Sequence, residues 1–351
     1  MKKLALKVDV DTYRGTLEGV PRLVDLFEKH GVKATFFFSL GPDTSGKAIK
    51  RVFRKGFIRK VLSASPAASY GLRTMLYGTL LPAPDIGGRK ETVLRMREAA
   101  AAGHAVGIHA WDHVDWHDRL PKMTRSQIEE VVAKEHARFV EIFGEPARFQ
   151  AAPGWSATPL SVEVQGAHGL VATSDTRGGE PFFPIRADGT PSKVLEIPST
   201  LPTLDELLAV RLPGAGSQRE KVCKFLRMRM REGPAAGGGG AGPATAAPDA
   251  GAAQTAVDVH SIHTEIEGAA SFHDWFAEQL RGWKSDGVSF LTFEEICRTL
   301  LPAPALARSE RDESASTPAR SAREQISIPV KRLAFTTLPG RATPVATGVA
   351  P

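Results

Sequence analysis

Short runs of β-branched and aromatic residues alternate along this chain with longer runs in which apolar residues recur every three or four positions. This alternation is typical of βα units, whose strands join one parallel sheet covered by helices. Roughly seven or eight units can be distinguished, which favours a closed barrel over an open doubly wound sheet. The predicted strands are 4–10, 33–40, 105–109, 148–152, 170–174, 194–197 and 257–266, and the predicted helices include 21–30, 91–102, 124–143 and 272–284.

The composition is that of a globular protein from a reducing compartment. The chain has 351 residues, 42% of them hydrophobic, which is enough for one large α/β domain with tails. Its two cysteines, Cys223 and Cys297, lie far apart, so neither a disulfide framework nor a thiolate zinc site is indicated. The apolar run at the N-terminus is too short for a signal peptide, and no stretch approaches the roughly 20 apolar residues of a spanning helix. We therefore expect a cytoplasmic protein with at most peripheral membrane contact.

Three segments interrupt the barrel pattern, and the barrel itself is assigned to residues 1–302. Within 46–84, lysines and arginines interleave with apolar residues, which predicts a basic amphipathic helix that binds an anionic membrane surface or a lipid phosphate. A solvated basic helix packed on the barrel is the alternative. Residues 233–256 are almost wholly Gly, Ala, Pro and Thr and predict a mobile loop, and 303–351 predict a disordered tail. The basic residues assigned to the membrane are Lys50, Arg51, Arg54 and Lys55.

Acidic and imidazole side chains gather at the predicted carboxyl ends of neighbouring strands. Asp9 and Asp11 end the first strand, where the side-chain period of two places both carboxylates on one side. His109 ends another strand, and His113 follows within one helical turn. Because the carboxyl ends of parallel strands meet at one face of a barrel, these side chains are expected to converge. One carboxylate with two imidazoles suits zinc, manganese, cobalt or ferrous iron.

Each of these motifs has a structural alternative when it is taken alone. An Asp-x-Asp pair often serves as a turn or helix-capping device, and a His-x-x-x-His pair also occurs on amphipathic surfaces. Two carboxylates close together repel each other unless a cation, a shared proton or an arginine lies between them. Both motifs at neighbouring strand ends therefore favour a metal site on Asp11, His109 and His113.

The motif set resembles the polysaccharide deacetylase family, the NodB-homology hydrolases. A third family motif is recognisable at 151–155, although its arginine position holds Ala151, and a last motif ends at His263. The resemblance implies an α/β fold, a distorted (β/α)7-type barrel of the NodB-homology kind, and one divalent metal ion, which is zinc, manganese or cobalt. It implies a base, Asp9, ligands Asp11, His109 and His113, a general acid, His263, and an oxyanion bound by a backbone N–H near Gly154 or Trp155. Without the resemblance, a buried structural histidine would be as good an interpretation of His263 as a general acid.

The resemblance narrows to deformylases that act on 4-deoxy-4-formamido-L-arabinose linked to undecaprenyl phosphate. It implies removal of the formyl group during lipid A modification with aminoarabinose, which is associated with polymyxin resistance, at the cytoplasmic face of the inner membrane. A deacetylase of peptidoglycan or chitin-like N-acetyl sugars is one alternative, although such enzymes usually need export. A non-catalytic barrel that holds lipid phosphates is another, whereas no recognised RNA-binding motif indicates nucleic acid. The similar stretches are 9–16, 38–43, 109–113, 174–178 and 262–268.

The missing arginine of the third motif leaves open which residue orients Asp9. We expect Arg177, which follows Asp175 at a neighbouring strand end, to take this place, and we assign both residues to the substrate-binding region. An arginine at the surface or in contact with a phosphate is the alternative. A guanidinium within about 4 Å of the Asp9 carboxylate would support the expectation.

Overall fold

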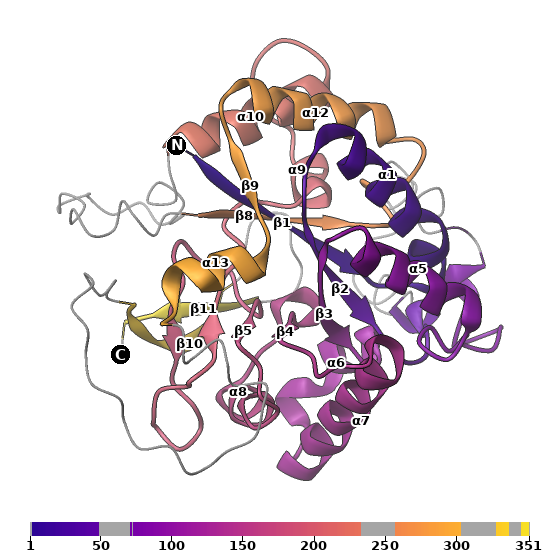
Figure 1. The fold of residues 1–351 in the computed structure, drawn as a ribbon, viewed down its shortest axis with the longest axis vertical. Coiled ribbons are helices and arrows are strands. Elements are labelled where there is room, and N and C mark those ends of the chain that lie inside the picture. Colours follow the sequence, from indigo (N-terminus) through magenta and orange to yellow (C-terminus); the bar gives the residue numbers. More distant parts are fainter. Residues whose placement is uncertain are drawn as a thin grey trace.

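One long strand, β1 (Lys3–Val10), pairs with three other strands of the parallel sheet that organises the molecule (Figure 1). The structure is a computed structural model that describes residues 2–48, 71, 73–232, 257–302, 328–336 and 345–350. Within these residues the sheet has eight strands, the other seven being β2 (Thr35–Ser39), β3 (Ala105–Ala110), β4 (Phe149–Gln150), β5 (Ala172–Thr173), β7 (Leu195–Glu196), β8 (Asp258–His263) and β9 (Ser289–Leu291). Their order is β7-β5-β4-β3-β2-β1-β8, and β9 pairs with the amino end of β1.

The sheet curls until its two ends meet. The segment after β7 reaches β8, where the backbone N–H groups of Thr200 and Leu201 donate to the Val259 carbonyl, each at 3.0 Å. Leu201 also forms a parallel bridge with His260. This contact joins the two ends of the strand order, so the parallel sheet closes as a distorted barrel. The predicted barrel fold is confirmed.

Helices cover the outside of the barrel, and local signals determine where several of them begin and end. The longest, α7, begins at a capping box between Thr124 and Gln127 and ends at Gly144, whose φ is 80°. The helices are α1 (Val20–His30), α5 (Lys90–Ala101), α6 (His113–Arg119), α7 (Arg125–Phe143), α8 (Pro159–Gly166), α9 (Leu204–Ala209), α10 (Gln218–Glu232), α12 (His273–Ser285) and α13 (Phe293–Leu300), with short turns η1 (Gly15–Gly19), η2 (Ser45–Ala48), η3 (Thr74–Leu76), η4 (Leu120–Lys122) and η5 (Pro153–Trp155).

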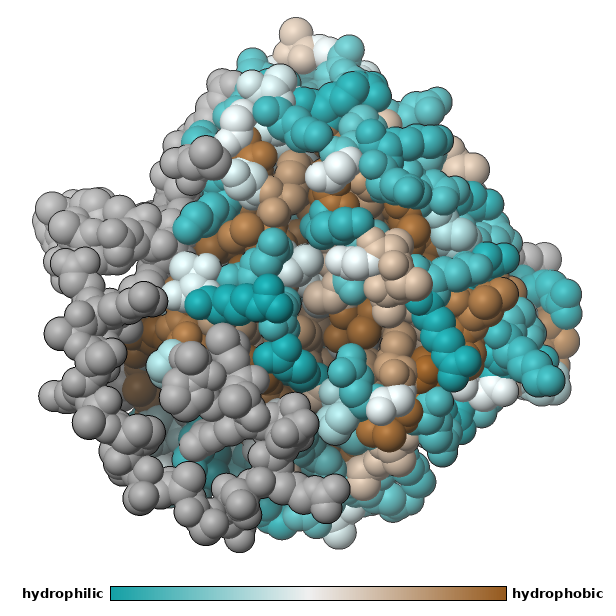
Figure 2. Space-filling view, viewed as in Figure 1, coloured by the Kyte–Doolittle hydropathy of each residue, from teal (hydrophilic) through white to brown (hydrophobic). Residues whose placement is uncertain are grey.

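Alternation along β1 sorts its side chains between the two sides of the sheet. Val8 faces outward into the apolar cluster beneath the helices, whereas Ala5 belongs with Phe37 to a second apolar cluster inside the barrel. Lys7 and Asp9 share the parity of Ala5, so they also lie on the inner side, nearer the carboxyl end. The barrel interior therefore changes from apolar at its amino end to charged at its carboxyl end. Figure 2 shows hydrophilic side chains over the outer helices, with apolar side chains toward the middle of the same face.

The carboxyl-terminal residues form a second sheet, so the predicted disorder of 303–351 is wrong for 328–336 and 345–350. In this sheet β10 (Val330–Thr336) lies between β11 (Val345–Val349) and β6 (Phe183–Pro184). The strands β10 and β11 are the yellow strands of Figure 1. The Arg177 N–H donates to the Ala346 carbonyl at 2.8 Å, and Ala346 is fully buried. The composition of the tail does not indicate that backbone groups of β6 and Arg177 are available to pair with it.

Two other predicted features lie outside the described residues. These are the mobile loop at 233–256 and most of the basic segment, including its membrane-assigned residues Lys50, Arg51, Arg54 and Lys55. Among the described residues, no helix combines the length and the apolar character needed to cross a bilayer.

Candidate metal centre and active site

The carboxyl end of β1 places two carboxylates at the mouth of the barrel. Val10, between them, is fully buried in the outer apolar cluster, so Asp9 and Asp11 lie on the inner side, as the alternation predicts. Thr12 follows, and both its backbone N–H (3.1 Å) and its hydroxyl (2.5 Å) donate to Glu265 Oε1. These two bonds hold the turn that presents Asp11.

β3 and α6 supply two imidazoles to the same mouth. His109 lies near the end of β3, and His113 begins α6, whose N-cap Asp112 accepts hydrogen bonds from two backbone N–H groups of the first turn. His109 Nε2 lies 3.1 Å from Asp11 Oδ1. His113 Nε2 lies 3.6 Å from the same oxygen. One ligand atom of each residue lies within 4.8 Å of the others, so the structure brings the three predicted metal ligands together.

Hydrogen bonding determines which nitrogen of His109 faces Asp11. His109 Nδ1 lies 2.7 Å from the Ala151 carbonyl oxygen. Because a carbonyl oxygen only accepts, Nδ1 carries the proton, and in the neutral ring Nε2 then presents a lone pair. That lone pair faces an oxygen of Asp11, and two such acceptors repel each other unless a proton or a metal ion lies between them. The donor set therefore fits a divalent metal ion.

The charges of the site shift the pKa values of its groups. Burial acts to raise the pKa of Asp11, but attraction to the protonated forms of His113 and His109 outweighs it and holds this pKa far below its usual value. Burial lowers the pKa of His113 to about 3, an effect that the Asp11 charge only partly offsets. At neutral pH the carboxylate is therefore ionised and His113 is neutral, which are the states that metal binding requires.

His263 faces these residues from the neighbouring strand. It ends β8 and pairs in register with Asp9 of β1. Burial acts to lower its pKa, but the charges of Asp11, Asp205 and other nearby carboxylates raise this pKa to about 9. Asp205 belongs to α9, and its Oδ1 lies 4.0 Å from His263 Nδ1. A histidine that is protonated at neutral pH can act as a proton donor.

Comparisons with known proteins relate this arrangement to one family. The polysaccharide deacetylase model matches residues 2–173. The chain is 31% identical over 294 residues to a probable 4-deoxy-4-formamido-L-arabinose-phosphoundecaprenol deformylase (ArnD) of Shewanella sediminis, covering 84% of this chain and 85% of the relative. The chain belongs to the polysaccharide deacetylase family. A probable ArnD of Wigglesworthia glossinidia brevipalpis is 26% identical over 283 residues, covering 80% of this chain and 88% of the relative.

The fold of this chain is shared with a solved structure. A probable polysaccharide deacetylase of Pseudomonas aeruginosa PAO1 superposes with a TM-score of 0.52, covering 85% of this chain and 90% of that chain at 16% identity. At this identity the likeness concerns the fold alone. The predicted family and its hydrolase class are confirmed by the relatives together with the family model.

The third deacetylase motif forms the short turn η5 after β4. Gly154 and Trp155 have positive φ values, 59° and 54°, which glycine adopts freely and tryptophan adopts only under strain. The Trp155 indole donates to the Ser199 hydroxyl at 2.8 Å, and this contact helps to hold the strained residue. The Trp155 backbone N–H already donates to the Ala152 carbonyl at 3.2 Å. Of the two predicted oxyanion donors, we therefore favour Gly154.

Arg177 does not take the place predicted for it beside Asp9. Its guanidinium packs on the Trp155 ring at 4.7 Å, and its Nη2 lies 3.5 Å from Glu206 Oε2. The cation that contacts Asp9 is instead Lys7, whose Nζ donates to Asp9 Oδ2 at 2.7 Å. The prediction is corrected because the side chain two positions earlier on the same strand already points to the same side of the sheet.

Asp175 holds the backbone of the third motif. Its Oδ1 accepts a hydrogen bond from the Ala152 N–H at 2.7 Å, and the side chain is fully buried. Burial, together with the Glu196 charge, raises its pKa well above the usual value, against a smaller lowering by Lys7. Asp175 thus positions the loop that carries Gly154, whereas the substrate contact assigned to it from the sequence stays a prediction.

Sequence reasoning missed two charged residues of this site. Lys7 could have been found, because it shares the parity of Asp9 and Asp11 on a strand whose alternation is plain in the sequence. Asp205 gives no such signal, since it reaches His263 from α9, beyond the end of β7. Only the packing of that helix against the barrel mouth brings the two together.

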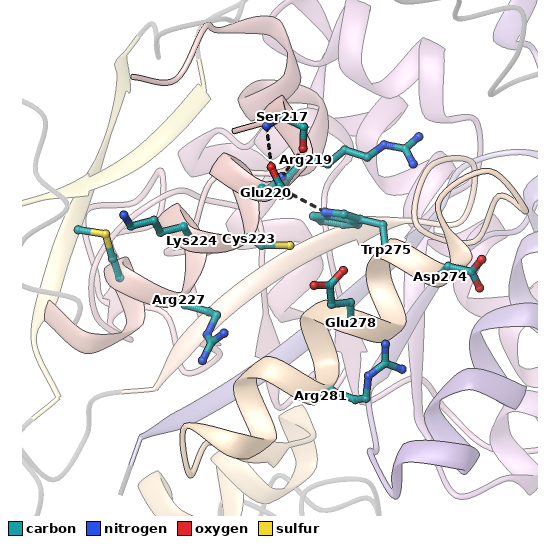
Figure 3. A pocket seen from close by; sticks show the side chains of 11 residues that line it. Ser217, Arg219, Glu220, Cys223, Lys224, Arg227, Asp274, Trp275, Glu278 and Arg281 are labelled. Atoms are coloured by element: carbon teal, nitrogen blue, oxygen red, sulfur yellow. Dashed lines mark hydrogen bonds between the residues drawn. The ribbon is translucent and has the colours of Figure 1, made fainter. Parts of the chain in front are cut away.

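A groove of about 980 Å³ lies between α10 and α12 and is separate from the metal centre (Figure 3). The Trp275 indole donates to the Arg219 carbonyl at 3.3 Å, and Arg227 pairs with Asp286 at 2.7 Å, so the two helices are tied along their length. The groove belongs to the outer helical layer. Its lining residues are Ser217, Arg219, Glu220, Cys223, Lys224, Arg227, Met228, Asp274, Trp275, Glu278 and Arg281, none of which belongs to the site described above.

Proposed function

We propose that this chain is a metal-dependent amide hydrolase that removes the formyl group from 4-deoxy-4-formamido-L-arabinose carried on undecaprenyl phosphate. The observation that carries the proposal is the convergence of Asp11, His109 and His113 beside the carboxylate of Asp9 and the imidazole of His263. A metal site flanked by one base and one acid is the set that hydrolysis of an amide by metal-activated water requires. The formamido sugar in the name of the Shewanella sediminis relative supports the substrate.

The metal would be one divalent ion, zinc, manganese or cobalt, held by Asp11, His109 and His113. One oxygen and two nitrogen ligands leave open positions for water and substrate. When bound, such an ion lowers the pKa of water and polarises the formamide carbonyl. The Ala151 carbonyl keeps the proton of His109 on Nδ1, so that Nε2 stays available as a ligand.

The proton transfers are assigned to Asp9 and His263. Asp9 Oδ1 is buried, accepts no hydrogen bond from the described residues and lies 3.9 Å from His109 Nδ1, so it can take a proton at the metal centre. His263, whose pKa is raised to about 9, would give a proton to the sugar nitrogen as the C–N bond breaks. The backbone N–H of Gly154 would bind the oxyanion. The products are formate and the free amino sugar.

The substrate is proposed to reach the site from the cytoplasmic face of the inner membrane. The chain that leads into the basic segment lies close to the metal centre, because Gly41, five residues before the segment begins, donates its N–H to the Trp111 carbonyl at 2.9 Å, two residues beyond His109. Basic residues near an anionic leaflet each contribute about 1 kcal/mol to membrane binding. The residues proposed to meet the membrane or the lipid phosphate are Lys50, Arg51, Arg54 and Lys55.

The deciding experiment measures formate release from the formamido-arabinose lipid with and without a chelator. We expect a chelator to abolish release and a divalent ion to restore it. His109→Gln should lose both metal binding and activity, whereas the matched control His168→Gln, at a ring that stacks on His136, should keep both. Asp9→Asn should bind metal but release little formate.

The same assay distinguishes the alternative functions. Acetate release from the acetamido analogue or from N-acetyl oligosaccharides, in place of formate release, would identify a deacetylase. Binding of the lipid without any hydrolysis by the metal-loaded protein would indicate a non-catalytic barrel.

Membrane contact is tested by sedimentation with anionic liposomes. Charge reversal at Lys50, Arg51, Arg54 and Lys55 should abolish sedimentation. Unchanged sedimentation would remove the membrane role. The matched control reverses four surface charges near the amino end of the barrel: Lys2, Lys29, Lys33 and Lys284.

A further inference from the structure

Lys7 is a buried charge in the interior of the barrel. Its side chain is 1% exposed, and its ammonium lies 5.5 Å from the ring centre of Trp155 and 5.9 Å from that of Phe37. An ammonium is costly to remove from water unless an anion and polarisable groups compensate it. Here the anion is Asp9, at 2.7 Å from Lys7 Nζ.

The pairing leaves the two oxygens of Asp9 in different environments. Oδ2 accepts from Lys7, and its position is therefore determined by β1 itself, two residues earlier on the strand. Oδ1 accepts no hydrogen bond from the described residues and lies 3.9 Å from His109 Nδ1. One oxygen is held and the other is directed toward the metal ligands.

The end of β4, where the third deacetylase motif of the family carries an arginine, supplies no charge that could replace Lys7. This end carries Ala151, which is fully buried and contributes only its carbonyl, to His109. Arg177 is engaged with the Trp155 ring and with Glu206. Asp9 thus depends on a cation from its own strand.

We propose that Lys7 is the positioning residue for Asp9: it holds Oδ2 so that Oδ1 faces the metal centre. Lys7 itself does not touch the metal ligands or the substrate and acts through Asp9. The inference rests on the proposed function, because the base that Lys7 positions is the base of that hydrolysis. A purely structural ion pair would instead stabilise the barrel without any specific effect on turnover.

The test compares Lys7→Met, which removes the charge at similar volume, with Lys7→Arg, which keeps it. Misplacement of a catalytic group by about 1 Å can cost roughly 10²-fold in rate. We expect kcat of Lys7→Met to fall by about that factor with KM changed less than about threefold. Lys7→Arg should stay within about tenfold of the wild type. The surface variant Lys33→Met is the control and should leave kcat unchanged.

A double-mutant cycle separates positioning from stability. In the Asp9→Asn background, Lys7→Met should cost less than about a further threefold in kcat, because its effect passes through Asp9. An equal loss in both backgrounds, or an unchanged kcat in the single variant, overturns the proposal. If Lys7→Met does not fold, Lys7→Gln, which keeps an N–H donor but no charge, takes its place in the cycle.

Two readouts do not depend on turnover. Cobalt titration of Lys7→Met should give a Kd within about threefold of the wild type, because Lys7 is not a ligand; loss of cobalt binding overturns the proposal. A crystal structure of the cobalt-loaded variant should show the Asp9 carboxylate rotated, with Oδ1 no longer beside His109. If the Asp9 carboxylate of Lys7→Met is not rotated, the proposed role of Lys7 is refuted, whether or not the wild type releases formate. If the carboxylate is rotated but the wild type releases no formate, only the proposed function is refuted.

Discussion

Replacing Gly15 by alanine should destabilise the protein by about 3 kcal/mol, because this position has no room for a Cβ atom. A Cβ built on Gly15 would lie 2.1 Å from Glu265 Oε1 and 2.4 Å from Thr264 Oγ1. The same Glu265 oxygen accepts the two hydrogen bonds from Thr12 that hold the turn after β1. Glu265 therefore cannot move away from the added methyl group without losing those bonds.

The magnitude follows from three contributions. Overpacking at a buried position costs about 1–3 kcal/mol. Each lost Thr12 bond costs about 1 kcal/mol. The better helix propensity of alanine offsets about 1 kcal/mol of this destabilisation. Because Thr12 directly follows Asp11, the metal affinity should also fall, by about tenfold or more.

Urea unfolding at pH 7 and cobalt titration measure the two effects. Gly166→Ala is the matched control, since this glycine ends α8 and a Cβ built on it would lie 3.9 Å from its nearest neighbour beyond the helix, Val194 Cγ2. The control should be neutral or slightly stabilising. A Gly15→Ala protein that unfolds at the wild-type urea concentration and binds cobalt with wild-type affinity would refute the steric reasoning.

Three further predictions concern stability. Removing residues 345–351 should lower the thermal midpoint by the equivalent of about 2 kcal/mol, because the burial of Val345 and the hydrogen bond from the Arg177 N–H to the Ala346 carbonyl are lost. An unchanged thermal midpoint in calorimetry would contradict this prediction. Burial lowers the pKa of His104 to about 4, whereas its unfolded pKa is about 6.5. The protein should therefore keep its full stability above about pH 6.5 and lose up to about 3 kcal/mol as the pH falls toward 4, because the unfolded state then binds a proton that the folded state does not. Urea unfolding at pH 7 and pH 4.5 should show this loss of stability, and the loss should be smaller in His104→Gln. Thr124→Ala should lower the free energy of unfolding in urea by about 1 kcal/mol, because it removes the N-cap of α7. Thr124→Ser, which keeps a capping hydroxyl, should have the wild-type stability. Equal urea midpoints for the two variants would argue against a capping role of Thr124.

Local chemistry explains which parts of the fold were predictable. The helix over 124–143 was located to within a residue because its capping box and its terminal glycine are both local in sequence. The inward placement of Asp9 and Asp11 followed from the alternation of β1, and that of His109 from its position at a strand end. The barrel itself followed from the repeated βα pattern, since parallel strands with helical crossovers have few ways to bury both faces.

The errors have a common physical origin in long-range packing. The strands at 330–336 and 345–349 form because β6 offers backbone groups that an extended segment can pair with, and composition carries no record of such an edge. Arg177 was assigned to Asp9 from its place at a strand end, but its side chain pairs with Glu206 on a helix that the sequence did not indicate.

What the sequence by itself determined is therefore the order of the elements, the side of each strand on which a residue lies, and the identity of the acidic and imidazole groups at the strand ends. Periodicity and capping are properties of neighbouring residues, so they can be read without knowing the fold. Only the tertiary structure decided that Lys7 contacts Asp9, that Asp205 approaches His263 and that the tail closes on Arg177. Those contacts depend on the rotamer and the distance of groups brought together by the closed barrel, which residue type and spacing do not specify.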